Sequence, residues 1–499
     1  MSGTDPASST ASGTRGDDSG AGGQPSRGNL SALDGAVLVV GVVLGVGIFR
    51  SPSVVAMNAG GATLSLGAMT LNLSGGALYL GLWLLGGLVM LLGALCYAEL
   101  ATAYPDAGGE YYILSRGWGA PAGFLVAWSR MTVIQTGSLA ILAYVFGDYV
   151  SSMLALGPTG PPALAAGVVV ALTAVNVTGL KQGRWTQYLL TGGAVAAMSA
   201  VIVAGLLLAP GTTGTAAGAG GEAPALQTQI GRASRAMIFV LLAYGGWSEG
   251  AYVSAEIEDR SRGIGRVLLW GTGAITLLYV LVNAAYLNGL GLEAIAASDA
   301  VAADLLQTVV GPWGARVVTV AILLAALSSA NATVITGARS NYAMGRDWSL
   351  FRPFGQWSDD REAPINALLL QGGIALLLVG FGAVERSGFQ AMVDYTAPIF
   401  WLVLLFTGLS VIVLRRREPE AERPYEVPLY PLTPILFAGA ATYMLYSSIT
   451  YAGDGALLGV AVMLAGVPFV WFSNVDTRGD GPSEGDGAGP DGPDSTRPT

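Results

Sequence analysis

Apolar residues fill long, nearly uninterrupted stretches of this chain, and polar residues collect in the short segments between them. About 20 apolar residues are enough for an α-helix to cross the hydrocarbon core of a membrane. Judged by apolar length and flanking charge, the pattern predicts about twelve membrane-spanning helices. They are expected near 34–57, 76–102, 119–150, 162–178, 186–208, 234–257, 265–288, 313–342, 364–382, 391–414, 432–451 and 454–473.

Three segments fall outside this pattern. Residues 292–310 carry Glu293, Asp299 and Asp304 between apolar positions, which predicts an amphipathic surface helix and not a further span. Residues 1–30 and 476–499 are rich in Gly, Ser and Asp and are expected to be disordered tails. The sequence thus predicts one all-α membrane domain over 31–475 with a tail at each end.

Composition agrees with a membrane location and excludes several kinds of site. Only 11% of the residues are charged, whereas soluble domains carry about 25%. The chain has no His and a single cysteine, Cys96, inside an apolar run. The usual zinc sites, His-based catalytic triads and intramolecular disulfides are therefore excluded. The basic residues form no continuous patch, so nucleic acid binding is not expected. The tails are acidic and the whole chain has a single lysine, Lys181, which suggests a salt-adapted or GC-rich source.

The distribution of basic residues predicts the orientation. Every second loop is rich in Arg, and the loops between these hold little beyond Arg232, Arg235 and Arg386. By the positive-inside rule both termini are cytoplasmic, which requires an even number of spans. The loops assigned to the cytoplasm contain Arg116, Lys181, Arg184, Arg260, Arg262, Arg266, Arg346, Arg352, Arg361, Arg415, Arg416, Arg417 and Arg423.

Two of the predicted spans contain glycine where a continuous helix is unfavourable. The first has Gly45 and Gly47 with Pro52 soon after, and the sixth has the pair Gly245-Gly246. Unwound backbone at membrane depth is tolerated where it lines a cavity or is buried in protein. Helix N-termini offer N–H groups to a carboxylate, and exposed carbonyls suit an ammonium. Such a pair of breaks predicts a receptor for a zwitterion.

The glycine breaks, and the charged residue Glu249 that follows the second break, each allow more than one interpretation. Gly41 and Gly45 also have the spacing of a close-packing surface between helices, although a second break in the sixth span favours a binding site. Glu249 follows that second break and is expected near the membrane midplane, where an ionisable group suggests function. It could carry a coupling proton, contact an ammonium group, or only offset free N–H groups at the start of a helix.

Seven motifs follow one another along the chain: GVVLGVGIFRSP (Gly41–Pro52), YAELATAYPDAGGEYY (Tyr97–Tyr112), NVTGLKQGRWTQ (Asn176–Gln187), AYGGWSEGAYVSAEIEDRSRGIGR (Ala243–Arg266), Leu292–Val309, SSANATVITGARSNYAMGRD (Ser328–Asp347) and RRREPEAERPYEVPLYP (Arg415–Pro431). In this order they resemble the amino acid–polyamine–organocation superfamily, and within it the L-type amino acid transporters and their bacterial relatives. The resemblance covers about residues 30 to 475.

The resemblance implies a leucine-transporter-like fold, with inverted repeats at about 31–208 and 234–414, discontinuous first and sixth helices, and two further helices over 432–473. It implies that a substrate carboxylate binds the backbone at Gly45, Val46, Gly47 and Ile48. The α-amino group would bind carbonyls of Val43, Leu242, Ala243 and Gly245. The side chain of Leu242 would gate the site and Trp401 would border it.

The chain departs from the family pattern at several positions. Val46 stands where a serine is usual, Leu242 is smaller than the usual phenylalanine, and Ala194 replaces the lysine of proton-coupled relatives. Ser328 and Ser329 are weak sodium candidates, because such serines more often bond to the backbone. Glu110 and Arg339 are candidates for gating ion pairs. The loop between the third and fourth spans lacks the cysteine through which animal members bind a heavy chain, so no disulfide-linked partner is expected.

Together these features predict a secondary active transporter of the cell membrane that works by alternating access, as a monomer or homo-oligomer and without a cofactor. The mode is exchange, facilitated uptake or proton-linked uptake, and neutral amino acids are the expected substrates. Glu249 leaves cationic amino acids or polyamines open as the alternative. A transporter-like amino-acid sensor without flux is the alternative of another class. An enzyme is not expected, because no catalytic constellation is present.

Overall fold

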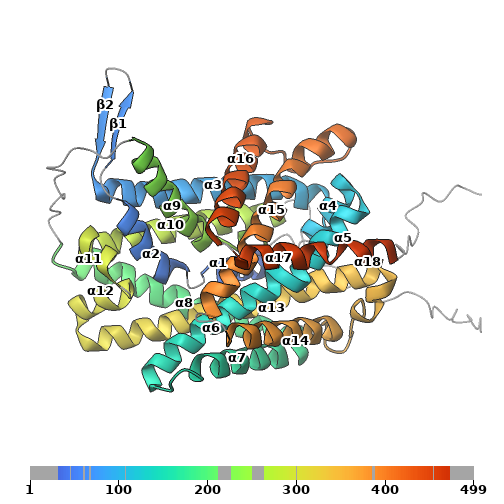
Figure 1. Cartoon of the computed structure of the whole chain (residues 1–499), viewed down its shortest axis with the longest axis horizontal. Coiled ribbons are helices and arrows are strands. Elements are labelled where there is room, and N and C mark those ends of the chain that lie inside the picture. Colours follow the sequence, from blue (N-terminus) through green and yellow to red (C-terminus); the bar gives the residue numbers. More distant parts are fainter. Residues whose placement is uncertain are drawn as a thin grey trace, which may run out of the picture.

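The computed structural model describes residues 32–44, 47–59, 62–66, 69–106, 108–211, 226–249, 263–298, 300–384, 388–452 and 454–472. It is a bundle of helices that run mainly along the long axis of the molecule (Figure 1). In chain order the elements are α1 (Ala32–Val43), α2 (Gly47–Asn58), β1 (Ala62–Leu66), β2 (Met69–Leu73), α3 (Gly75–Ala103), α4 (Glu110–Trp118), α5 (Ala120–Ser129), the π-helix η1 (Arg130–Ile134), α6 (Gln135–Leu154), α7 (Gly160–Val177), α8 (Leu180–Val203), the π-helix η2 (Ala204–Leu208), α9 (Leu226–Ala243), α10 (Gly263–Leu290), α11 (Leu292–Ala297), α12 (Val301–Val310), α13 (Pro312–Asp347), the 3-10 helix η4 (Ser349–Phe354), α14 (Ile365–Gly382), α15 (Gly388–Arg417), α16 (Leu432–Ala452), α17 (Asp454–Leu464) and α18 (Val467–Phe472).

Nine helices within the described ranges are long and apolar enough to cross a membrane. They coincide with nine of the twelve predicted spans, from the helix at 75–103 to the helix at 432–450. The other three predicted spans are present as shorter pieces: α1 with α2, α9 with the turns after it, and α17 with α18. The all-α membrane fold is thus confirmed, and the count of twelve stays a prediction.

The outer surface of the bundle is apolar, as a lipid-facing surface must be. Large side chains such as Trp270, Leu277 and Leu377 are exposed on α10 and α14. Soluble proteins rarely expose contiguous apolar patches of more than a few hundred Å². In a bilayer the same side chains face lipid, where exposure has no cost.

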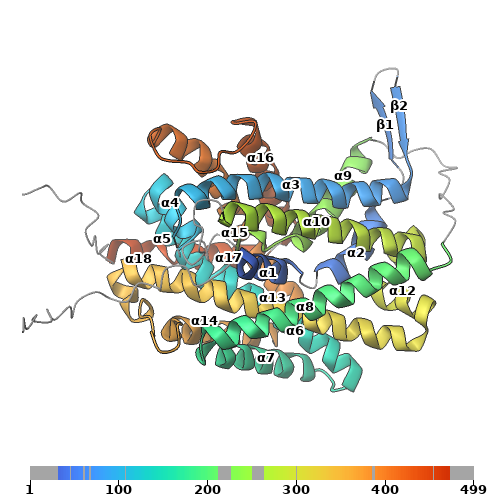
Figure 2. The same cartoon turned by 180° about the vertical axis from the view of Figure 1, so that it is seen from behind.

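The broken helix at the N-terminus lies inside the bundle. In both views α1 lies at its middle and α2 lies between α1 and the end that carries β1 and β2, with longer helices around them (Figure 2). α1 contacts α8, α10 and α13, and α2 packs against α9. Around this centre, α3 packs along α10, α6 along α7 and α13 against α8. The first predicted interruption therefore lies at the core of the molecule.

Two smaller elements complete the description. Strands β1 and β2 form an antiparallel hairpin in which Thr63 pairs with Asn72, an element that we did not predict. The amphipathic helix expected at 292–310 is present as two helices, α11 and α12, which bury Ile295, Leu305 and Leu306 against the bundle. The predicted tails at 1–30 and 476–499 lie outside the described residues.

Candidate functional site

The first interruption separates α1 from α2. α1 ends at Val43, and the Leu44 N–H still donates to the Val40 carbonyl at 2.8 Å. α2 begins at Gly47, and Gly45 and Val46 lie outside the described residues. The first N–H groups of a helix have no partner within it. The start of α2 therefore provides donors and a partial positive charge, as a carboxylate requires.

The second interruption follows α9. This helix ends at Ala243, and residues 244–246 form a turn before a single 3-10 turn at 247–249. Gly246 has φ = 97°, a conformation that residues with a side chain rarely adopt. Both glycine breaks predicted from the sequence thus coincide with the end of a regular helix.

The two interruptions contact each other through glycine. A Cβ atom added to Gly47 would lie 2.6 Å from the Cα of Ala243. A Cβ atom added to Gly246 would lie 2.4 Å from Cγ1 of Val42. A side chain at Gly47 would push the two backbones apart, and a side chain at Gly246 would collide with the side chain of Val42. The N-terminus of α2 and the C-terminal end of α9 are therefore held in direct contact.

Tyr279 of α10 also contacts both interruptions. Its hydroxyl donates to the Val43 carbonyl at 2.6 Å and lies 3.3 Å from the Ala243 carbonyl. The ring is buried beside Tyr244, with ring centroids 5.0 Å apart, and Trp83. The sequence analysis did not select Tyr279, because its partner Val43 is 236 residues away along the chain.

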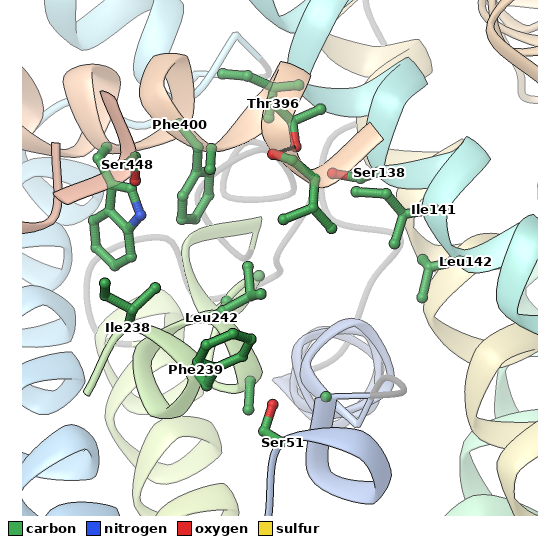
Figure 3. A pocket seen from close by; sticks show the side chains of 18 of the residues that line it. Ser51, Ser138, Ile141, Leu142, Ile238, Phe239, Leu242, Thr396, Phe400 and Ser448 are labelled. Carbon is green, nitrogen blue, oxygen red and sulfur yellow. Dashed lines mark hydrogen bonds between the residues drawn. The ribbon is translucent and has the colours of Figure 1, made fainter. Parts of the chain in front are cut away.

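A cavity of about 440 Å³ lies where the broken helices meet α6, α15 and α16. Figure 3 shows Leu242 and Phe239 of α9 facing Phe400 and Thr396 of α15, with Ser138, Ile141 and Leu142 of α6 along one side. Most of the lining is apolar, and its polar groups are the hydroxyls of Ser51, Ser138, Thr333, Thr396 and Ser448, the amide of Gln135 and the carboxylates of Glu249 and Asp394. Such a site suits a small molecule with one apolar side chain.

Most of the candidate residues from the sequence lie together at this cavity. Its lining includes Val43, Gly47, Leu242, Ala243, Gly245, Glu249 and Trp401. Ile48 is not among the residues that line the cavity, and its side chain is fully buried. Ala194, which stands where proton-coupled relatives have a lysine, is buried on α8 and is not among the residues that line the cavity.

Glu249 belongs to a buried charged network that extends away from the cavity. One Arg130 nitrogen, Nη2, donates to both oxygens of Glu249 at 3.0 and 2.9 Å, and Gln135 Nε2 donates to Oε2 at 2.8 Å. Arg130 Nη1 donates to Glu110 Oε2 at 3.0 Å, and Tyr97 donates to Glu110 Oε1. The three charged side chains are at most 6% exposed. Removing one partner of such a pair costs about 3–5 kcal/mol.

The sequence analysis missed Arg130, although a signal was present. It is a charge well inside the apolar run predicted as the third span, whose other charge, Asp148, lies near the end of that run, and intramembrane charges mark functional or paired positions. Of the two gating candidates, Glu110 pairs with Arg130. Arg339 is buried on α13 and donates to the Ile335 carbonyl at 3.1 Å.

The two sodium candidates form hydrogen bonds with neighbouring groups. Ser329 Oγ lies 2.8 and 2.7 Å from the carbonyls of Gly41 and Val42, to which it donates. Ser328 Oγ accepts from Gln187 Nε2 at 3.1 Å and lies 2.8 Å from Thr191 Oγ1. The Ser329 hydroxyl thus satisfies carbonyls at the end of α1 from within the protein, and Ser328 connects α13 to α8.

Comparison with known proteins identifies one matching family and several similar amino acid transporters. The sequence profile described as "Amino acid permease" matches residues 30–472. The b(0,+)-type amino acid transporter 1 of Mus musculus is 29% identical over 413 residues, which cover 82% of this chain and 80% of that protein. The large neutral amino acids transporter small subunit 2 of Mus musculus is 29% identical over 466 residues, covering 92% and 83%. The human form of the first is 28% identical over 425 residues, covering 84% and 82%.

Proposed function

The chain belongs to the family of amino acid permeases, and on that premise we propose that it carries neutral amino acids across the cell membrane by alternating access. The observation that carries this proposal is the meeting of two helix interruptions at one cavity. The N–H groups at the start of α2 would bind the substrate carboxylate. The carbonyls of Val43 and Ala243 would bind its ammonium.

The dimensions and lining of the cavity support a neutral substrate. Its volume of about 440 Å³ falls within the usual range of roughly 300–1,000 Å³ for small-molecule sites. Leu242, Phe400 and Trp401 would surround the substrate side chain. Gly45 and Val46 remain proposed carboxylate contacts, and Leu242 remains the proposed gate.

The remaining properties of the transporter are also proposals. Both termini would be cytoplasmic, because the arginine-rich loops then lie inside. The protein would work as a monomer or homo-oligomer without a disulfide-linked partner. Its only cysteine, Cys96, is buried in α3 and is out of reach of another chain. No covalent chemistry is needed, because the substrate is moved unchanged.

Uptake into proteoliposomes tests the proposal directly. The purified protein is reconstituted, and entry of labelled leucine, alanine, glutamine, lysine and arginine is measured with and without internal amino acid. The same uptake is repeated with a pH gradient and with a sodium gradient. We expect uptake of neutral amino acids, and a requirement for internal substrate would identify exchange. Absence of flux for every amino acid, with binding retained, would favour a sensor and contradict transport.

A further inference from the structure

Glu249 carries the only charge of the second interruption among the described residues. Its carboxylate borders the cavity, but both of its oxygens already accept hydrogen bonds. Nη2 of Arg130 donates to Oε1 and Oε2, and Gln135 donates a third hydrogen bond to Oε2. A charge-assisted pair of this kind is stronger than a neutral hydrogen bond. A cationic substrate side chain would therefore have to compete with a buried guanidinium for this carboxylate.

The position of Arg130 depends on an irregular stretch of helix. Arg130 is the first residue of η1, a π-helical turn between α5 and α6. π-helical turns are rare and frequently occur at functional sites. Ile134 and Gln135, at the end of this turn, line the cavity, whereas Arg130 itself does not. The turn thus places the guanidinium behind the cavity wall, in contact with Glu249 but not with the substrate space.

A second carboxylate holds the guanidinium in place. Nη1 of Arg130 donates to Glu110, the first residue of α4, and the Arg130 side chain is only 1% exposed. Glu110 does not line the cavity. The guanidinium is therefore fixed between one carboxylate at the cavity and another outside it.

We propose that Arg130 determines the charge specificity of the transporter, by occupying Glu249 and so denying that carboxylate to cationic substrates. The inference rests on the proposed function and deepens it, because it names the residue that restricts the substrate class. Arg130 is a positioning residue, since it acts through Glu249. Specificity here comes from an internal competitor for the site and not from a repulsive charge in the cavity.

Two double variants with equal charge test this role. Counted as formal charges, Glu110, Glu249 and Arg130 together contribute −1 in the wild type. Arg130→Met with Glu110→Gln leaves only Glu249, and the net charge stays at −1. Arg130→Met with Glu249→Gln leaves only Glu110, again −1. The variants differ only in whether the remaining carboxylate borders the cavity, so a difference between them does not come from total charge.

The wild type is expected to take up leucine and to take up lysine and arginine only poorly. In the variant that keeps Glu249, the uptake ratio of lysine to leucine should rise about tenfold or more, because a charge-assisted hydrogen bond becomes available. The variant that keeps Glu110 should show no such rise. Equal ratios in the two variants, or efficient lysine uptake by the wild type, would overturn the proposal.

A further variant distinguishes Glu249 from the other acidic residue of the lining, Asp394. Asp394 lies on α15 with its Cβ against Gly455 of α17. Asp394→Asn is added to the variant that keeps Glu249. The gain in lysine uptake should remain. If it disappears, the cation binds at Asp394 and the assignment to Glu249 is wrong.

Binding measurements separate this inference from the proposed function. Thermal stabilisation of the purified protein by leucine and by lysine is measured for the wild type and both double variants. If no protein shows flux, the transport proposal fails, and the inference is decided by whether lysine stabilises only the variant that keeps Glu249. If the wild type transports leucine but neither flux nor binding of lysine appears in that variant, the inference alone fails. If the double variants do not fold, the wild type still provides a test. The proposed role of Arg130 is overturned if lysine stabilises the wild type as strongly as leucine does.

Discussion

At the scale of single residues, the hydroxyl of Tyr279 has the most consequential contacts. It donates to the carbonyl of Val43 and lies near that of Ala243, so one side chain of α10 connects the ends of α1 and α9. Both carbonyls belong to the proposed ammonium site. The hydroxyl therefore orients acceptors that the substrate would also use.

Tyr279→Phe should loosen this arrangement without disturbing the packing of the ring. We expect the KM for a neutral amino acid to rise by about fivefold, because a hydrogen bond of about 1 kcal/mol that positions the site is lost. The maximal rate should change less than KM. Both are obtained from initial rates of uptake into proteoliposomes over a range of substrate concentrations.

Tyr286→Phe is the matched control on the same helix. The Tyr286 ring is also fully buried, but its hydroxyl has no hydrogen-bond partner among the described residues. Removing an unpartnered buried hydroxyl should leave stability and KM nearly unchanged. If both variants raise KM equally, the effect comes from α10 as a whole and not from the hydroxyl of Tyr279.

Single residues also show how far sequence reasoning extends. Gly47 and Gly246 could be identified in advance, because glycine pairs inside apolar runs have a local physical meaning. Arg130 was visible as an intramembrane charge, but its partners are 20 and 119 residues away. Nothing local in the sequence specifies such partners. The identity of a charged pair in the core could be learned only from the fold.

At the scale of elements, the segment after α15 is anchored to α4 by an ion pair. Glu418 follows the last residue of α15, and Arg116 Nε donates to its two oxygens at 2.8 and 3.0 Å. Tyr104 donates a further hydrogen bond at 3.1 Å. The hydrogen bond from Arg116 is the main cause that lowers the pKa of Glu418 below its ordinary value of 4.5.

This pair should make stability depend on pH in a defined direction. Because the pKa of Glu418 is lower in the folded state, its contribution is complete above about pH 4.5 and is lost as pH falls through the folded-state pKa. The difference in melting temperature between the wild type and Glu418→Gln should therefore shrink as the pH is lowered from about 7 to 4. The difference itself should be small, because the pair is partly exposed.

Glu420→Gln serves as the control, since Glu420 lies two residues further along the same segment and is exposed. Its melting temperature should follow that of the wild type at every pH. A difference between Glu418→Gln and the wild type that stays constant down to pH 4 would mean that the charge of Glu418 does not stabilise the segment.

Elements differed in how well the sequence predicted them. The long helices followed from apolar length alone, because a membrane leaves few other structures for such runs. The hairpin at 62–73 was missed even though Leu64, Leu66, Leu71 and Leu73 alternate with other residues in the two-residue period of a strand. The π-helical turn η1 has no comparable signal, since RMTVI could equally continue an α-helix.

At the scale of the whole molecule, the cavity is formed by helices from distant parts of the sequence. α1, α2 and α9 form one side, and α6, α15 and α16 contribute the other residues that face them. The hydropathy pattern predicts each of these helices but not which of their faces meet. Alternating access requires that these two groups of helices move relative to each other, so that the cavity opens to one side of the membrane at a time.

A cysteine placed in the cavity tests this consequence. Ser138 of α6 lines the cavity, and the one native thiol, Cys96, is fully buried. In a Cys96→Ala background, Ser138→Cys should react with a small charged thiol reagent applied from one side of a proteoliposome, and a transported amino acid should slow that reaction. Ser349→Cys on the exposed 3-10 helix η4, outside the membrane-length helices, is the control, and its reaction should not depend on substrate. Reaction of Ser138→Cys at equal, rapid rates from both sides, unaffected by substrate, would indicate an open pore and contradict alternating access.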